Sequence, residues 1–123
     1  FYLHQAAICD WLYELWKNNE YDLIMTPGPD DPHPDHQVVY RAAVAVFGKY
    51  SSVLIYGNHN YQLNSNFYVT FDSEIMDEKR YTLGIYNSQS YRAYFQPEII
   101  EANHLHSIGG VYAEKFKVYK WFI

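Results

Sequence analysis

The chain has 123 residues, a hydrophobic fraction of 49%, a charged fraction of 19% and a formal net charge of −5. These values predict one folded domain and exclude an intrinsically disordered chain. The nine Lys and Arg residues are scattered, which argues against nucleic-acid binding through a basic face. Apolar runs are short, so no membrane span is expected. The single cysteine, Cys9, excludes an internal disulfide framework and fits a cytoplasmic protein.

Apolar periodicity predicts alternating helices and strands along the chain. In the first half of the chain we expect a helix over 2–18, a strand over 21–25, a helix from about Pro34 that Gly48 stops, and a strand over 52–56. In the second half we expect a strand over 67–71, a helix from 73 to about 87, a helix over 98–105, a break at Gly109–Gly110 and a strand over 115–123. A strand, a loop, a helix and a second strand in succession form a βαβ unit, in which the two strands run parallel. The sequence therefore predicts an α/β fold with a mostly parallel sheet flanked by helices.

The loop between the first strand and the second helix is stiff. Residues 26–36 contain four of the five prolines of the chain, and each proline restricts its own φ and the conformation of the residue before it. The loop therefore cannot be helical before Pro34, which suits the first turn of the following helix. Either His33 or Asp35 is suited to be the N-cap of that helix.

Chemically reactive side chains are concentrated at the end of this loop. His33 and His36 lie three positions apart across the helix start, and Asp30, Asp31 and Asp35 surround them. Imidazole is the commonest zinc ligand, and a neighbouring carboxylate can orient it through its other ring nitrogen. In α/β sheets, ligands bind beyond the carboxyl ends of the strands, where this loop is expected. The same pattern also fits an ordinary acidic surface loop that caps a helix, and the spacing alone leaves both interpretations open.

Three segments of the chain resemble, in the same order, motifs of the LmbE-like/PIG-L family of zinc-dependent N-deacetylases. Residues 21–27, followed by Asp31-Pro32-His33-Pro34-Asp35-His36 and a helix, resemble the strand and the His-Pro-Asp-His motif of the family. Residues 79–89 resemble its Lys-containing helix that ends in Ser-Gln, and residues 110–116 resemble its closing Tyr-Ala-Glu-x-Phe segment. The first motif of the family, His-Pro-Asp-Asp-Glu, is not in this chain.

The resemblance implies that residues 1–123 form a single, partial deacetylase domain. Its sheet would be Rossmann-like, mostly parallel, flanked by helices and incomplete at its N-terminal side. The implied activity is zinc-dependent removal of an acyl group from an N-acyl amino sugar, such as an N-acetylglucosamine derivative. His36 would bind the metal, His33 would stabilise the oxyanion, and Asp35 would hold His33 and keep it cationic. The remaining metal ligands and the general base would come from the missing motif.

Two other interpretations of the sequence stay open. One is a truncated or degenerate domain without catalytic activity that binds a carbohydrate or a partner subunit. The other is an acidic α/β interaction domain whose histidine loop is structural, and self-association into a homo-oligomer is compatible with each interpretation. The other polar candidates have simpler explanations. His59 fits a loop residue, His104 and His106 fit a surface pair, and Lys79 and Gln89 fit surface residues on a helix and at its end.

Overall fold

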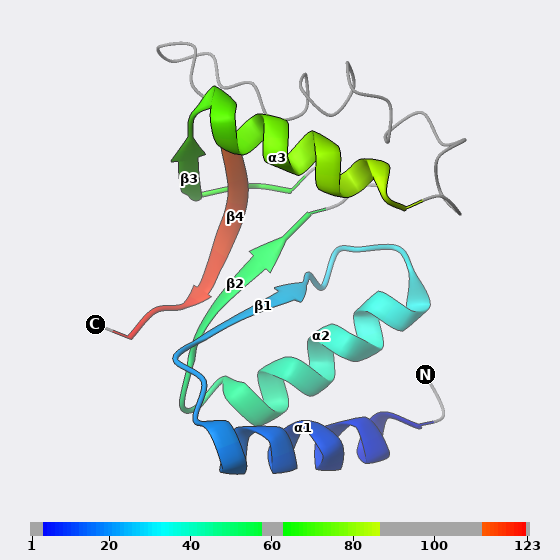
Figure 1. Cartoon of the computed structure of the whole chain (residues 1–123). Helices are drawn as coiled ribbons and strands as arrows, with labels where there is room; N and C mark the ends of the chain where they lie inside the picture. Colours follow the sequence, from blue (N-terminus) through cyan, green and yellow to red (C-terminus); the bar gives the residue numbers. More distant parts are fainter. Residues whose placement is uncertain (1–3, 58–62, 87–111, 123) are drawn as a thin grey trace. The chain divides into compact units, whose positions relative to one another are not determined.

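The computed structural model describes residues 4–57, 63–86 and 112–122 (Figure 1). The elements in chain order are α1 (Gln5–Asn19), β1 (Leu23–Pro27), α2 (Pro34–Phe47), β2 (Ser52–Tyr56), β3 (Phe67–Phe71), α3 (Ser73–Gly84) and β4 (Tyr112–Lys120). The predicted order of helices and strands is confirmed over this part of the chain. The helix expected over 98–105 and the break expected at Gly109–Gly110 lie outside the described residues.

The ends of three elements differ clearly from those expected. Strand β1 covers residues 23–27 instead of the expected 21–25 and ends at Pro27, the first proline of this segment. Helix α3 ends at Gly84 instead of near residue 87, because glycine is a poor helix former. Strand β4 covers residues 112–120, shifted toward the N-terminus from the expected 115–123. Differences of a few residues are common at the ends of elements.

The sheet has four strands in the hydrogen-bonded order β1-β2-β4-β3. Strands β1 and β2 are parallel, with Leu23 opposite Ser52 and Pro27 opposite Tyr56, as the βαβ pattern predicts. Strands β2 and β4 are antiparallel, so the sheet is mixed where a mostly parallel one was expected. Helix α2 fixes the direction of β2 relative to β1, whereas no such short crossover precedes β4. The predicted α/β class, with a sheet flanked by helices, is confirmed.

The chain divides into two compact units, one formed by residues 1–67 and 115–123 and the other by residues 68–114. In the first unit, α2 lies between α1 and the strands β1 and β2 (Figure 1). The core cluster consists of residues on the last turns of α2, and side chains from α1 and β1 pack against it. The members of the cluster are Ala43, Val46 and Phe47, and the packing side chains are Cys9, Leu12, Trp16 and Ile24. This packing positions α2 relative to the two parallel strands. It also positions the loop of residues 28–33 that precedes α2, here called the histidine loop.

The second unit contains α3 and the beginning of β4. Asp72 is the N-cap of α3, because its carboxylate accepts a hydrogen bond from the amide of Ile75 at 3.0 Å. Met76 is the fully buried side chain of the helix, and the rings of Phe71 and Tyr112 stack with their centroids 6.0 Å apart. Across both units, the described helices include none that is long and apolar enough to span a membrane.

Candidate functional site

The histidine loop leaves the sheet at the carboxyl end of β1, where the sequence analysis placed it. Residues 28–33 connect Pro27 at the end of β1 to Pro34 at the start of α2. Because β1 and β2 are parallel, Tyr56 ends the neighbouring strand at the same edge of the sheet. The loop therefore occupies the position at which α/β proteins commonly bind their ligands.

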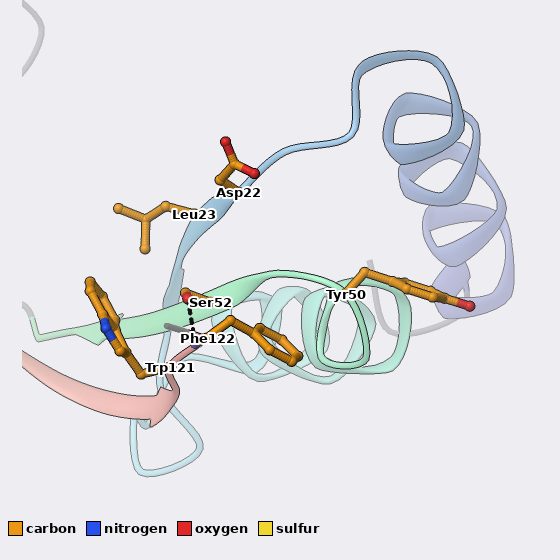
Figure 2. A pocket seen from close by; sticks show the side chains of 6 residues that line it. All are labelled: Asp22, Leu23, Tyr50, Ser52, Trp121 and Phe122. Atoms are coloured by element: carbon orange, nitrogen blue, oxygen red, sulfur yellow. Dashed lines mark hydrogen bonds between the residues drawn. The ribbon is translucent and has the colours of Figure 1, made fainter.

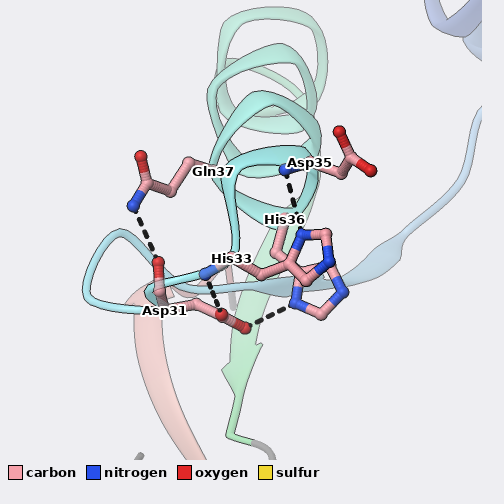
Figure 3. A network of polar contacts seen from close by, with 5 residues as sticks. All are labelled: Asp31, His33, Asp35, His36 and Gln37. Atoms are coloured by element: carbon pink, nitrogen blue, oxygen red, sulfur yellow. Dashed lines mark hydrogen bonds and ion pairs between the residues drawn. The ribbon is translucent and has the colours of Figure 1, made fainter. Parts of the chain in front are cut away.

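Asp31 organises the loop through hydrogen bonds to His33, His36 and Gln37 (Figure 3). One oxygen of its carboxylate accepts a hydrogen bond from the amide of His33 at 2.9 Å, and the other contacts Nδ1 of His36 at 2.7 Å. Its backbone carbonyl accepts a hydrogen bond from the side-chain amide of Gln37 at 2.9 Å. With 1% of its surface exposed, Asp31 is a buried acid, and buried acids are stable in a fold only when they are paired in this way.

His33 is the N-cap of α2, with an extended backbone, and Pro34 follows in the first turn. The expectation that His33 or Asp35 caps the helix is therefore resolved in favour of His33. Its Nδ1 atom accepts a hydrogen bond from the amide of Asp35 at 3.2 Å. A ring nitrogen that accepts a hydrogen bond carries a lone pair, so a neutral His33 has its proton on Nε2. His33 thus offers an N–H donor on the side of the ring opposite the helix cap.

His36 lies beside His33 on the first turn of α2. The two rings stack with their centroids 4.4 Å apart and an angle of 19° between their planes. The side chain of His36 is 40% exposed, while the Asp31 side chain that it contacts is 1% exposed. The structure therefore brings together the two histidines that the sequence predicted as a pair, and Nδ1 of His36 contacts the buried acid Asp31.

Asp35, the third predicted site residue, contacts His33 through its backbone amide. The prediction that its carboxylate holds His33 in the cationic form stays a prediction. The carboxylate of Asp31 contacts the ring of His36, and the sequence had grouped Asp31 with its acidic neighbours without indicating a partner for it. A usable signal was present, because an acid two residues before an N-cap commonly accepts a hydrogen bond from the amide of the N-cap residue.

The polar environment at this edge of the sheet extends to β2. Burial, together with the negative charge of Asp31, raises the pKa of Tyr56 above its usual value of 10.0, so the phenol keeps its proton and remains able to donate. Thr26, at the end of β1, is 1% exposed, and its hydroxyl has no hydrogen-bond partner among the residues described. A buried hydroxyl without a partner costs roughly 1–3 kcal/mol, so a further polar group at this position would be stabilising.

The described residues do not form a complete catalytic zinc site by themselves. Within residues 4–57, 63–86 and 112–122 there is no group of three or more His, Cys, Asp or Glu side chains that could hold a metal ion. A catalytic zinc site normally has three protein ligands and one open position. The histidine loop can supply His36 as one ligand of the preferred type, and the others would have to come from elsewhere.

Of the remaining candidates, Lys79 forms an ion pair with Glu114 within the second unit, joining α3 to the start of β4. This contact gives Lys79 a structural role. His59, Gln89, His104 and His106 lie outside the described residues.

Comparisons with known proteins identify the fold. No family model matches the sequence. A search of curated proteins also found no significant match. Among solved structures, the chain is similar to the conserved protein TT1542 from Thermus thermophilus, with a TM-score of 0.78 and 21% sequence identity. The similarity covers 95% of this chain and 60% of the Thermus protein, so the chain spans less than two thirds of the length of that structure.

Proposed function

We propose that this chain carries part of the active site of a zinc-dependent N-deacetylase of the LmbE-like/PIG-L type. The substrate class is an N-acyl amino sugar, such as an N-acetylglucosamine derivative. One observation supports the proposal above the others: His33 and His36 stack at the carboxyl end of β1, but their Nδ1 atoms have different partners. A hydrolase of this type needs one imidazole that binds metal and one that donates to the substrate, and two differently held rings suit these two roles.

His33 is suited to stabilise the oxyanion. Amide hydrolysis passes through a tetrahedral intermediate with a negatively charged oxygen, and a donor fixed in advance stabilises that charge. The hydrogen bond from the amide of Asp35 to Nδ1 leaves the proton of a neutral His33 on Nε2, where it can be donated. The positive end of the α2 dipole lies at the same point, because His33 caps this helix.

His36 is suited to bind the metal, because contact of its Nδ1 with Asp31 leaves Nε2 as the nitrogen available for a ligand bond. The chemistry that a bound zinc ion would supply is polarisation of the carbonyl group of the substrate amide and a lowered pKa of a bound water. In this proposal the other ligands and the general base belong to a His-Pro-Asp-Asp-Glu motif in the complete protein. His36 would then be the contribution of this chain to the metal site.

A second candidate function is that of a domain without catalytic activity that binds a carbohydrate or a partner subunit. It is favoured by the lack of a three-ligand group within the described ranges. It is also favoured by exposed aromatic rings, among them Trp11 at 62% and Trp121 at 48%, since amphipathic rings suit contacts with sugars.

The metal content of purified variants of the complete protein distinguishes these two functions. His36→Ala is expected to lose most of its bound zinc, because one of the three ligands is removed. His33→Ala is expected to retain zinc, because its ring is assigned to the substrate. Trp11→Ala, on the exposed face of α1, is the matched control and should retain zinc. If His33→Ala loses the metal while His36→Ala keeps it, the assigned roles are reversed, and a zinc-free wild-type protein would support the second function.

A further inference from the structure

We propose that Asp31 is a positioning residue for His36. Its carboxylate holds the imidazole in the tautomer that has a proton on Nδ1 and a lone pair on Nε2, and so prepares the ring to bind a metal. This inference rests on the proposed role of His36 as a ligand. The function proposed above takes the contact between Asp31 and Nδ1 of His36 as given, and the inference adds that the carboxylate selects the tautomer and fixes the orientation of the ring.

The geometry fixes the Asp31 carboxylate more firmly than the ring it contacts. One carboxylate oxygen is held by the amide of His33 at 2.9 Å, and the backbone carbonyl is held by Gln37 at 2.9 Å. The side chain of Asp31 is 1% exposed, whereas that of His36 is 40% exposed. The ring of His36 also stacks on His33, but stacking does not distinguish its two nitrogens, whereas the contact between Nδ1 and Asp31 at 2.7 Å does.

Hydrogen-bond chemistry then selects the tautomer of His36. An ionised carboxylate can only accept hydrogen bonds, so Nδ1 of His36 must donate. In the opposite tautomer, two lone pairs would face each other over 2.7 Å, which is repulsive. The neutral ring therefore keeps its lone pair on Nε2, and this arrangement of carboxylate and histidine is a common one around metal ions.

The same reasoning gives His33 the opposite tautomer, because its Nδ1 accepts from the amide of Asp35. The two stacked rings therefore present different atoms at Nε2, a lone pair on His36 and an N–H on His33. Asp31 acts on the pair in two ways, since it also accepts the hydrogen bond from the amide of His33. Asp31 thus determines which of the two rings can bind a metal.

Nitrogen-15 NMR of the histidine rings tests this inference on the 123-residue chain without any metal or substrate. At about pH 8.5, where an ordinary imidazole is neutral, long-range proton–nitrogen correlations distinguish the two tautomers. Wild-type His36 should show the Nδ1–H form, with its signal assigned by its loss in His36→Gln. Asp31→Asn should move His36 toward a mixture of tautomers, whereas Asp30→Asn, the matched control next to it, should not. An Nε2–H form of His36 in the wild type overturns the inference, and this measurement needs no Asp31 variant to fold.

Zinc titration of the complete protein, followed on the same ring signals, provides the second measurement. Removing a carboxylate that orients a ligand histidine typically weakens metal binding about 10–100-fold, so Asp31→Asn should weaken zinc binding by that factor relative to Asp30→Asn. Weaker zinc binding with an unchanged tautomer would overturn the positioning role. A complete protein in which His36 has the Nδ1–H form but does not bind zinc would support the positioning by Asp31 and count against the proposed function. Failure of the positioning role of Asp31 and failure of the proposed function are therefore distinguishable.

Discussion

The two ends of strand β1 differ in what surrounds them. At the carboxyl end, the buried carboxylate of Asp31 holds two stacked histidines through hydrogen bonds. At the amino end, aromatic rings from α1, α2 and the loops pack together. Trp16 stacks on Tyr50 with ring centroids 4.2 Å apart, and Tyr21 meets the edge of Phe47 at 6.3 Å. The amino end therefore supplies apolar packing, and the carboxyl end supplies polar groups that are already oriented.

The amino end also has an open pocket (Figure 2). Its lining residues are Asp22, Leu23, Tyr50, Ser52, Trp121 and Phe122. Asp22 is the one carboxylate among them, and the hydrogen bond drawn there joins the amide of Phe122 to the hydroxyl of Ser52 at 2.8 Å. The pocket has no pair of titratable side chains comparable with His33 and His36. A hollow in the surface is thus a weaker indication of chemistry than two rings held in a defined orientation.

The largest effect on stability is expected from Phe47→Ala, which removes a 4% exposed ring from the core cluster. Loss of a buried phenylalanine typically costs about 3–5 kcal/mol, so the free energy of unfolding measured in urea should fall by that amount. Trp11→Ala, at a 62% exposed position on α1, is the control and should change it by less than about 0.5 kcal/mol. Equal effects of the two substitutions would show that the core is not centred on the end of α2.

The largest effect on activity is expected at the other end of β1. His33→Ala in the complete protein should slow amide hydrolysis roughly 10²–10³-fold, the usual effect of removing one oxyanion donor. Single-turnover rates with an N-acetyl amino sugar measure this, and Phe47→Leu, a milder change in the core, is the comparison. A rate within a few-fold of the wild type would remove His33 from the proposed mechanism.

A smaller effect separates the structural role of His33 from its chemical role. Loss of an N-cap costs about 1 kcal/mol, so His33→Ala should also lower the free energy of unfolding by that amount. Asparagine is a good N-cap, so His33→Asn should recover most of this stability. Because asparagine has no imidazole, the rate of hydrolysis should remain low. Recovery of both properties by asparagine would mean that His33 acts only as a cap.

Titration of Tyr56 provides a pH-dependent test of the carboxyl end. Burial and the charge of Asp31 raise the pKa of Tyr56 in the folded state above 10.0, so the phenol holds its proton more tightly there than in the unfolded chain. The corresponding stability is fully present below about pH 10 and is lost as the pH rises through the raised pKa. Urea unfolding at successive pH values above about 9 should therefore show a shallower fall for Tyr56→Phe than for the wild type. Identical pH dependence would mean that neither burial nor Asp31 raises the pKa of Tyr56 in the folded state.

The smallest effect is expected from Leu23→Ser in the pocket at the amino end. Leu23 is 44% exposed, and substitutions at exposed positions usually change stability by no more than about 0.5 kcal/mol. The rate of hydrolysis should be unchanged as well, because the residue lies at the end of β1 opposite the histidines. A marked loss of activity in this variant, with the free energy of unfolding preserved, would move the site away from the carboxyl end.

Local sequence determined much of the candidate site. Prolines at positions 27, 29, 32 and 34 restrict the backbone, so a strand, a stiff loop and a helix beginning at Pro34 follow from the chain itself. The spacing of His33 and His36 across the helix start placed both rings on one turn, where the structure has them. The parallel pairing of β1 and β2 also followed, because a helix that crosses between two strands requires it.

Tertiary structure decided the rest. The antiparallel pairing of β4 with β2 was not readable from alternation, because alternation fixes the faces of a strand and not its direction. Asp30, Asp31 and Asp35 are alike in sequence, and burial singled out Asp31, because a carboxylate removed from water must find donors nearby. The charge of Asp31 contributes to the raised pKa of Tyr56 because two parallel strands end at the same edge of the sheet. The sequence by itself therefore determined which reactive side chains lie on the loop, and the packing of α2 on the strands decided which partners hold them.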